Sequence, residues 1–325
     1  MKSVTVIIYE DAFLTAVASV LDLLTTANQL LVKSGKKRMF DITLAGEHQK
    51  YIQMELPVGF TCQKTLDEIK YTDLIIVPAF KGDRKPLDVL NNNQSAVQWI
   101  QKMYKKGTEV ASLCFGCFFL AEAGLLKGKS CTSHWMAIEG LQKRYPDINV
   151  NPDVILTDED GIYTGGGGFS SLNLLSYIIS KFCGREIAIQ LSKLFSIDLD
   201  RLTQSHFFVF QGQRRHEDEA IQQAQTYIEE NYNNEISITQ VAAQFPMSLR
   251  TFIRRFKKAT QYTPQQYLQR VKIEAAKKRL ERREETINEV MYQVGYTSPN
   301  AFRTVFKRVT GLTPSQYTQK YDRHF

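Results

Sequence analysis

Short runs of β-branched and other apolar residues alternate, through the first 195 residues, with segments whose apolar positions recur every three or four residues. The runs predict strands and the 3.6-residue period predicts helices. We expect strands at 3–9, 40–46, 73–80 and 109–114, a hairpin at 153–167, and helices at 13–31, 93–107, 118–126 and 171–184. Strands that alternate with helices of this length form a mostly parallel sheet covered on both faces. The pattern therefore predicts an α/β domain in three layers.

The pattern changes after residue 195. A polar, mixed stretch follows, and from Glu219 onward nearly every segment has the helical period, without a β-rich run. The sequence therefore predicts an α/β domain at 1–195, a linker at 196–219 and an all-α domain at 220–325.

Two segments of the last third, 237–268 and 286–317, share one pattern. Each has a short apolar helix, a tight break, a serine, an aromatic-x-x-x-Phe helix and then Thr-Pro. Ser248 and Ser298 are placed to cap the second helix of each copy, and Pro299 stands at a first helical position where its missing N–H does no harm. Two helices joined by a short turn form a helix-turn-helix, so we expect two such units.

The second helix of each copy has an apolar face and a polar face. Phe252 and Phe256 share one face through their i, i+4 spacing, as do Phe302 and Phe306, and both pairs should point inward. The opposite faces carry arginine, which pairs with guanine, and asparagine, which pairs with adenine. The outward residues are Arg250, Thr251, Arg254 and Arg255 in the first copy, and Asn300, Arg303, Thr304 and Lys307 in the second.

A strong helical pattern at 264–282 separates the two copies, with Tyr267, Val271, Ala275 and the stem of Lys278 on one stripe. A helix of this length spans about 28 Å. Successive major-groove segments on one face of B-DNA lie about 34 Å apart. One chain could therefore place both second helices in adjacent grooves.

Charge supports a polyanionic partner for the last third. From Arg214 to the C-terminus the chain holds 19 Lys and Arg against 12 Asp and Glu, which accounts for the whole net charge of +7. Such asymmetry favours nucleic acid, although a solvated basic surface would have the same composition.

The segment from about 221 to 323 resembles the AraC/XylS-type DNA-binding domain, through "VAAQFPMSLRTFIRRFKKATQYTPQQYL", "VKIEAAKKRLE" and "INEVMYQVGYTSPNAFRTVFKRVTGLTPSQY". The resemblance places base contacts on Arg250, Ile253 and Arg254, and on Asn300, Arg303 and Thr304. Ile253 could meet a thymine methyl or pack on the linking helix. We expect Lys257 and Lys258 to contact phosphates, and count Thr251 and Lys307 in the same interface.

The stretch "VASLCFGCFFLAEAGLL" at 110–126 places Cys114 between an apolar strand and a helix, with Gly116 two residues later. A thiol at a helix N-terminus feels partial positive charge, which lowers its pKa. A hydrolase would add a base and an orienting carboxylate.

This elbow, the order of elements and the later "CTSHW" resemble the class I glutamine amidotransferase-like superfamily, and within it the PfpI/ThiJ branch. The resemblance implies a flavodoxin-like three-layer sandwich and places its histidine at His134. Ala16 stands where enzymatic relatives have a glutamate, so we expect no catalysis. With its tail, the whole chain resembles the GlxA-type transcriptional regulators, which implies a homodimer that senses a small molecule around Cys114, Gly116 and His134.

Several alternatives stay open. Cys114 could be catalytic in an amidase- or hydratase-like enzyme with a DNA-binding tail, a redox-sensing thiol, or a structural remnant. Cys117 forms a Cys-x-x-Cys with Cys114 but is expected to be buried and inert. The glycine run in "TGGGGFSS" at 164–171 could hold an anion at the start of the following helix or allow close backbone approach.

Composition limits the remaining classes. Five scattered cysteines fit a reducing compartment. The apolar run at the N-terminus is interrupted by charged residues too early for a signal peptide. No apolar run approaches the length that a membrane span needs. No ligand-spaced cluster of histidines or cysteines indicates a metal, and we expect no cofactor. We expect a cytoplasmic regulator that binds double-stranded DNA and an effector, with RNA polymerase as a candidate partner.

Overall fold

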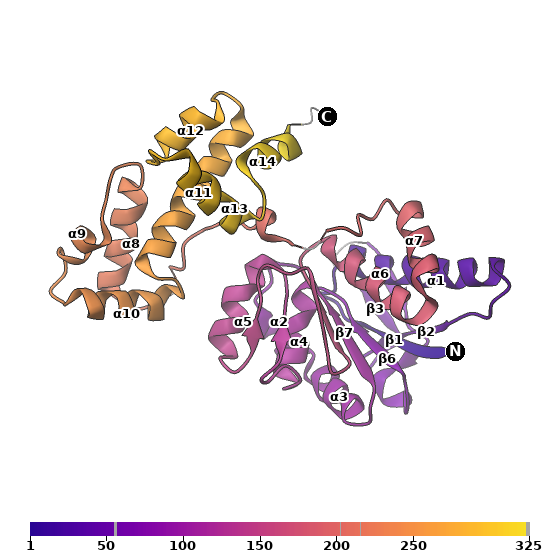
Figure 1. The fold of residues 1–325 in the computed structure, drawn as a ribbon. Coiled ribbons are helices and arrows are strands. Elements are labelled where there is room, and N and C mark those ends of the chain that lie inside the picture. The colour runs from indigo at the N-terminus through magenta and orange to yellow at the C-terminus, as the bar shows by residue number, and fades with distance from the viewer. Residues whose placement is uncertain (55–56, 202, 215, 323–325) are drawn as a thin grey trace. The chain divides into compact units, whose positions relative to one another are not determined.

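A computed structural model describes residues 1–54, 57–201, 203–214 and 216–322 (Figure 1). The chain divides into two compact units, Met1–Gln204 and Ser205–Phe325, called here the N-terminal and C-terminal units. The stretch expected as a linker contributes structure to both units. Thr203 forms an isolated bridge with Val154 in the N-terminal unit, whereas Phe210 is buried in a core of the C-terminal unit.

The N-terminal unit alternates strands and helices as expected. Its strands are β1 (Lys2–Ile8), β2 (Phe40–Gly46), β3 (Tyr51–Gln53), β4 (Gly59–Thr61), β5 (Lys64–Thr65), β6 (Leu74–Val77), β7 (Glu109–Leu113), β8 (Ser130–Cys131), β9 (Asn149–Val150), β10 (Leu156–Glu159) and β11 (Ile162–Gly165). Its α-helices are α1 (Leu14–Lys33), α2 (Pro86–Asn92), α3 (Gln94–Tyr104), α4 (Cys117–Glu122), α5 (Ile138–Arg144), α6 (Ser170–Cys183) and α7 (Arg185–Leu194). The 3₁₀ turns are η1 (Leu66–Glu68), η2 (Cys114–Gly116) and η3 (Trp135–Ala137).

Within the described residues, seven strands form one sheet in the order β10-β11-β7-β6-β1-β2-β5. All neighbours pair in parallel except β10 with β11, which form the hairpin expected around Asp160-Gly161. Helices α1, α6 and α7 pack together on one face, and α2, α3 and α4 on the other (Figure 1). This is the predicted flavodoxin-like three-layer sandwich. The order in which the chain adds strands to the sheet reverses at β1, because β2 lies on one side of β1 and β6 lies on the other.

Helix α1 corrects the expectation that no segment could span a membrane. It has 20 residues and is long and apolar enough to cross a membrane, by length and composition alone. Its apolar side chains Val17, Val20 and Leu24 are fully buried against the sheet and helices of this unit. The apolar character of α1 is that of a core helix.

The C-terminal unit is helical throughout its described part. It contains η4 (Ser205–Phe207), α8 (Glu219–Asn231), α9 (Ile238–Ala242), α10 (Leu249–Thr260), α11 (Pro264–Arg282), α12 (Ile287–Gln293), α13 (Pro299–Thr310) and α14 (Pro314–Tyr321). Two separate apolar cores hold these helices. The first core joins α8, α9, α10 and the start of α11, and the second joins the rest of α11 with α12, α13 and α14.

Candidate nucleic-acid interface and ligand pocket

Helices α10 and α13, called here the reading helices, begin at the two serines that the sequence analysis predicted as caps. Ser248 Oγ accepts a hydrogen bond from the backbone N of Thr251 at 3.2 Å, and Ser298 Oγ accepts one from Ala301 N at 3.4 Å. Pro299 occupies the first position of α13. The caps satisfy backbone N–H groups that a helix start leaves unpaired.

Each reading helix is held from behind by its buried phenylalanine pair. Phe256 packs edge-on against Tyr267 with ring centroids 5.3 Å apart, and Phe306 packs in the same way against Tyr317 at 5.4 Å. Both tyrosines follow the Thr-Pro step of their copy. The repeated contact turns the opposite face of each helix outward.

The outward faces carry most of the residues predicted to contact DNA. The exposed ones are Arg250, Arg254, Lys257 and Lys258 on α10, and Asn300, Arg303, Thr304 and Lys307 on α13. Within the described part of the chain, no hydrogen bond or ion pair engages their side chains. Basic groups that are unpaired inside the protein are available for phosphates and base edges.

Three residues of α10 that were counted on its outward face are only partly exposed. Ile253 is half-buried and packs against the first core. Arg255, placed on the outward face by its spacing, donates two hydrogen bonds to Asp218 at 2.9 and 2.7 Å. Thr251 is half-buried, and Ser248 Oγ donates to its hydroxyl at 3.0 Å. Arg255 therefore joins α10 to the start of α8 within the fold of the C-terminal unit.

Helix α11 has the predicted bounds, 264–282, but not the predicted single apolar stripe. Val271 and Ala275 are only half-buried, while Ile273 and Leu280 are buried in the second core. The reason is that α11 serves two cores in succession and so buries different faces at its two ends. The helix spans about 28 Å at 1.5 Å per residue.

A pocket of about 330 Å³ lies at the carboxyl ends of β1, β6 and β7 in the N-terminal unit. This edge, where the strand order reverses, is where ligands bind in open parallel sheets. The pocket brings together the predicted Cys114 and His134. Its lining is completed by Phe13, Thr15, Ala16, Ser19, Ala79, Phe80, Lys81, Gly82, Phe115, Met136, Gly168, Phe169, Ser171 and Leu172.

Most of this lining was not predicted, because the residues come from three separate segments that only the fold unites. The start of α1, the exit of β6 and the start of α6 each contribute side chains. The glycine run was the one signal in the sequence. A Cβ at Gly167 would overlap the His134 ring, so the run lets backbone approach the pocket closely.

Cys114 sits at a strained strand-to-helix elbow. Its φ is +53°, a left-handed conformation that residues other than glycine rarely adopt. Gly116 does not line the pocket but lies beneath the elbow, where a Cβ would come within 2.6 Å of the Val77 oxygen and 2.7 Å of the Pro78 oxygen. The chain can therefore turn tightly over the end of β6 only with glycine at this position.

The electrostatics of the thiol differ from the expectation of a lowered pKa. Burial raises the pKa of Cys114 to about 11, and the backbone N–H groups of Gly168 and Phe115 offset this only in part. The residue is 6% exposed, and the helix that follows is the short α4. Loss of solvation outweighs a weak helix dipole, so the thiol stays protonated near neutral pH.

His134 lies over Phe115 with ring centroids 5.4 Å apart, and its Nδ1 accepts a hydrogen bond from Met136 N at 3.1 Å. Burial lowers the pKa of His134 to about 4. The ring is therefore neutral at physiological pH. Ala16 lines the same pocket, and the described lining contains no aspartate or glutamate.

Gln204, the last residue of the N-terminal unit, ties the walls of the pocket together. Its amide nitrogen donates to the Ser133 carbonyl at 2.9 Å, and its oxygen accepts from Gly167 N at 3.1 Å. The side chain is 2% exposed. Ser133 and Gly167 flank His134 and Gly168, so one buried amide holds two lining segments in place.

Comparison with known proteins supports the division into two parts. Residues 11–176 match the DJ-1/PfpI family, and residues 241–320 match a helix-turn-helix domain. The HTH-type transcriptional regulator GbdR of Pseudomonas aeruginosa is 24% identical over 321 residues, covering 98% of this chain and 84% of that one. The HTH-type transcriptional regulator CdhR of the same species is 26% identical over 252 residues, covering 77% and 73%.

Solved structures support the fold of the N-terminal unit. An AraC family transcriptional regulator from Pseudomonas putida aligns with a TM-score of 0.52 and 19% identity, over 60% of this chain and all of that one. A ThiJ/PfpI family protein from Pseudomonas syringae aligns with a TM-score of 0.51 and 13% identity, over 62% and 76%.

The fold and the two sites define a transcriptional regulator with a helix-turn-helix DNA-binding domain. The chain belongs to the DJ-1/PfpI family, here joined to a helix-turn-helix domain like those of the HTH-type regulators it resembles.

Proposed function

We propose that this regulator reads double-stranded DNA with α10 and α13 in successive major-groove segments. The observation that carries the proposal is that each helix buries its phenylalanine pair and leaves Arg, Asn and Lys side chains exposed and unpaired within the described chain. Arg250 and Arg254 read bases in the first half-site, and Asn300 and Arg303 read bases in the second. Lys257, Lys258 and Lys307 contact phosphates, and Thr251 and Thr304 lie beside them in the interface.

The two classes of contact predict different mutant behaviour. The full-length protein would first select DNA from a random double-stranded pool. We expect Arg254→Ala to cost about 1–3 kcal/mol at one position of the selected site and to relax the base preference there. We expect Lys257→Ala to weaken every sequence alike and to reduce the salt dependence by about one counterion. Equal losses on all sequences for both variants would refute the assignment of base reading.

The N-terminal pocket binds a small effector with a chiefly apolar surface and does not turn it over. Its volume of about 330 Å³ is at the lower end of ligand pockets, and four phenylalanines line it. Catalysis lacks support because Ala16 replaces the carboxylate, the thiol is protonated and the lowered pKa of His134 makes it a weak base. The raised thiol pKa also weighs against a redox sensor, whose cysteine would react as a thiolate.

A thermal-shift screen of small apolar metabolites on the full chain tests this part. We expect a hit to raise the melting temperature of the wild-type protein but not of Ala16→Phe, which fills the pocket. Mass spectrometry of the recovered compound would then decide between sensing and catalysis. If the compound is recovered unchanged, the pocket binds it as an effector. If the compound is converted to a product, the enzyme hypothesis becomes the better one.

The regulator acts in the cytoplasm as a homodimer through its N-terminal unit, and contacts RNA polymerase when bound to DNA. Exposed apolar side chains near the end of α7 support a protein contact, with Leu194 64% and Leu199 41% exposed. Light scattering of the full chain tests the dimer, and a monomer at micromolar concentration would refute it. Promoter footprints with and without polymerase test the last contact.

A further inference from the structure

The two helix-turn-helix units meet at Lys272. The first core ends on α11 with Leu268 and the half-buried Val271, and the second begins with Ile273. Lys272 lies between these positions and is only 8% exposed. A buried lysine is costly unless its ammonium group finds partners, so its contacts need an explanation.

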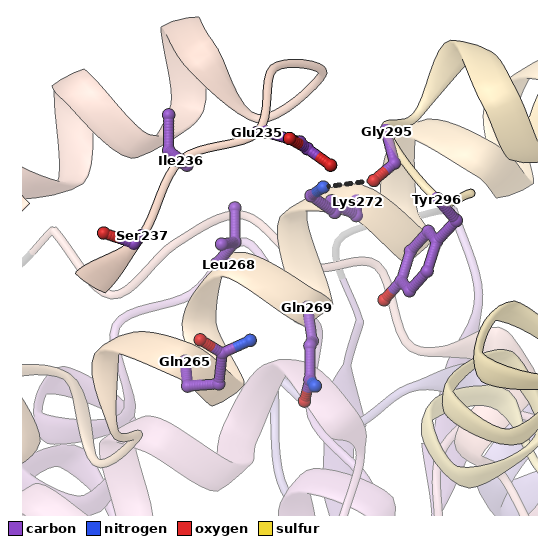
Figure 2. A pocket seen from close by; sticks show the side chains of 9 residues that line it. All are labelled: Glu235, Ile236, Ser237, Gln265, Leu268, Gln269, Lys272, Gly295 and Tyr296. Carbon is purple, nitrogen blue, oxygen red and sulfur yellow. Dashed lines mark hydrogen bonds between the residues drawn. The ribbon is translucent and has the colours of Figure 1, made fainter. Parts of the chain in front are cut away.

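The Lys272 side chain reaches from α11 to the turn that precedes α13. Its Nζ donates a hydrogen bond to the Gly295 carbonyl at 2.8 Å and lies 5.2 Å from the centre of the Tyr296 ring. Figure 2 shows this bond, with Glu235, from the loop between α8 and α9, close to the ammonium group. Burial lowers the pKa of Lys272, and the charge of Glu235 opposes that shift.

Gly295 brings a third segment into the same contact. Its φ is +72°, and a Cβ there would come within 2.7 Å of the Asn233 carbonyl and 2.8 Å of Lys272 Nζ. Asn233 follows α8, which packs in the first core. The turn before α13 therefore lies directly against the backbone that follows α8. Lys272, from the helix α11 that contributes to both cores, holds it there.

We propose that Lys272 is a positioning residue that fixes the separation and rotation of α10 and α13, and so sets the half-site spacing that this regulator accepts. The inference rests on the proposed reading of DNA by both helices. A one-base-pair insertion between half-sites shifts the second by about 3.4 Å and rotates it by about 34°. A rigid pair of reading helices cannot follow that change, whereas a loosened pair can. A further polar tie from α11 to α13, the hydrogen bond from Arg308 to Gln269 at 2.6 Å, is exposed and therefore weaker.

The test uses full-length protein and a double-stranded DNA that the wild-type protein has selected from a random pool. Affinity is measured for this DNA, for versions with one base pair inserted or removed between the half-sites, and for each half-site alone. We expect a loss of tenfold or more for wild-type protein when the spacing changes. For Lys272→Met we expect that loss to fall below threefold, with unchanged affinity for single half-sites.

Lys278→Met is the matched control, because Lys278 lies on the same helix, is exposed and carries the same charge. It should keep the full spacing penalty. A full penalty in Lys272→Met, or a fall in single half-site affinity that Lys278→Met does not share, would overturn the inference. Should circular dichroism find Lys272→Met unfolded, Tyr296→Leu removes the ring from the ammonium group and faces the same criteria. Failure of wild-type protein to select any sequence would instead sink the proposed function.

Discussion

Arg255 on α10 grips the carboxylate of Asp218 with two hydrogen bonds, from Nε at 2.9 Å and from Nη2 at 2.7 Å. The same carboxylate caps α8 by accepting a hydrogen bond from Ile221 N at 3.3 Å. Arg254, the residue next to Arg255 in the sequence, is exposed and has no such partner among the described residues. Of two adjacent arginines on one reading helix, Arg255 is therefore committed to the fold, whereas Arg254 is the one proposed to bind DNA.

This difference predicts opposite profiles for two alanine variants. Arg255→Ala should lower the free energy of unfolding of the C-terminal unit, since a forked but partly exposed ion pair is lost. Arg254→Ala should change that stability by less than about 0.5 kcal/mol and lose base preference instead. Urea denaturation and binding to selected DNA measure the two effects. An unstable Arg254→Ala beside a stable Arg255→Ala would contradict the assignment.

The raised pKa of Cys114, about 11, predicts a slow thiol. Between pH 7 and 9.5 the rate of alkylation by iodoacetamide at Cys114 should rise about tenfold per pH unit without reaching a plateau, because only the thiolate reacts. Mass spectrometry, peptide by peptide, separates this site from the other cysteines, with Cys114→Ala as the control. A plateau near pH 7 would mean that the backbone N–H groups outweigh burial, and redox sensing would become the better hypothesis.

Much of the architecture was predictable because local pattern and tertiary structure agree. Strand β2 and helix α11 have the predicted bounds, and Ser248 and Ser298 cap the reading helices as expected. Each of these features depends on residues close in sequence. Periodicity and capping rules read such features directly.

The missed features depend on partners far away in the chain. Arg255 meets Asp218 across 37 positions, and Gln204 meets Ser133 across 71. Lys272 looks like an ordinary polar residue of a helix that buries one face. Only the second core, which covers a different face of α11, makes it buried. No local pattern carries that information.

The pKa of His134, lowered by burial to about 4, predicts an acid-sensitive N-terminal unit. Unfolded histidine titrates near 6.5, so between about pH 6.5 and pH 4 the unfolded state binds more protons than the folded state. The contribution of His134 is thus complete above pH 6.5 and is lost as pH falls toward 4. Chemical denaturation of the full chain at a series of pH values measures this slope. His134→Asn, whose side-chain oxygen can replace Nδ1 as an acceptor but does not titrate, should have a shallower slope.

Replacing Gln204 should loosen the backbone of the two pocket segments that it holds before it affects the rest of the N-terminal unit. Gln204→Leu leaves the N–H of Gly167 and the carbonyl of Ser133 without their partner in a buried place, at a cost of about 1–3 kcal/mol for each unpaired group. Hydrogen exchange of the full chain should quicken at residues 133–136 and 166–169 before it quickens in the central strands. Gln204→Glu separates the two ends of the amide, because a carboxylate can still accept from Gly167 N but cannot donate to the carbonyls of Ser133, Pro152 and Val154. We therefore expect faster exchange at 133–136 in that variant and near wild-type protection at Gly167. Uniform quickening over the whole unit in both variants would mean that Gln204 stabilises the fold in general, without a particular hold on the two pocket segments.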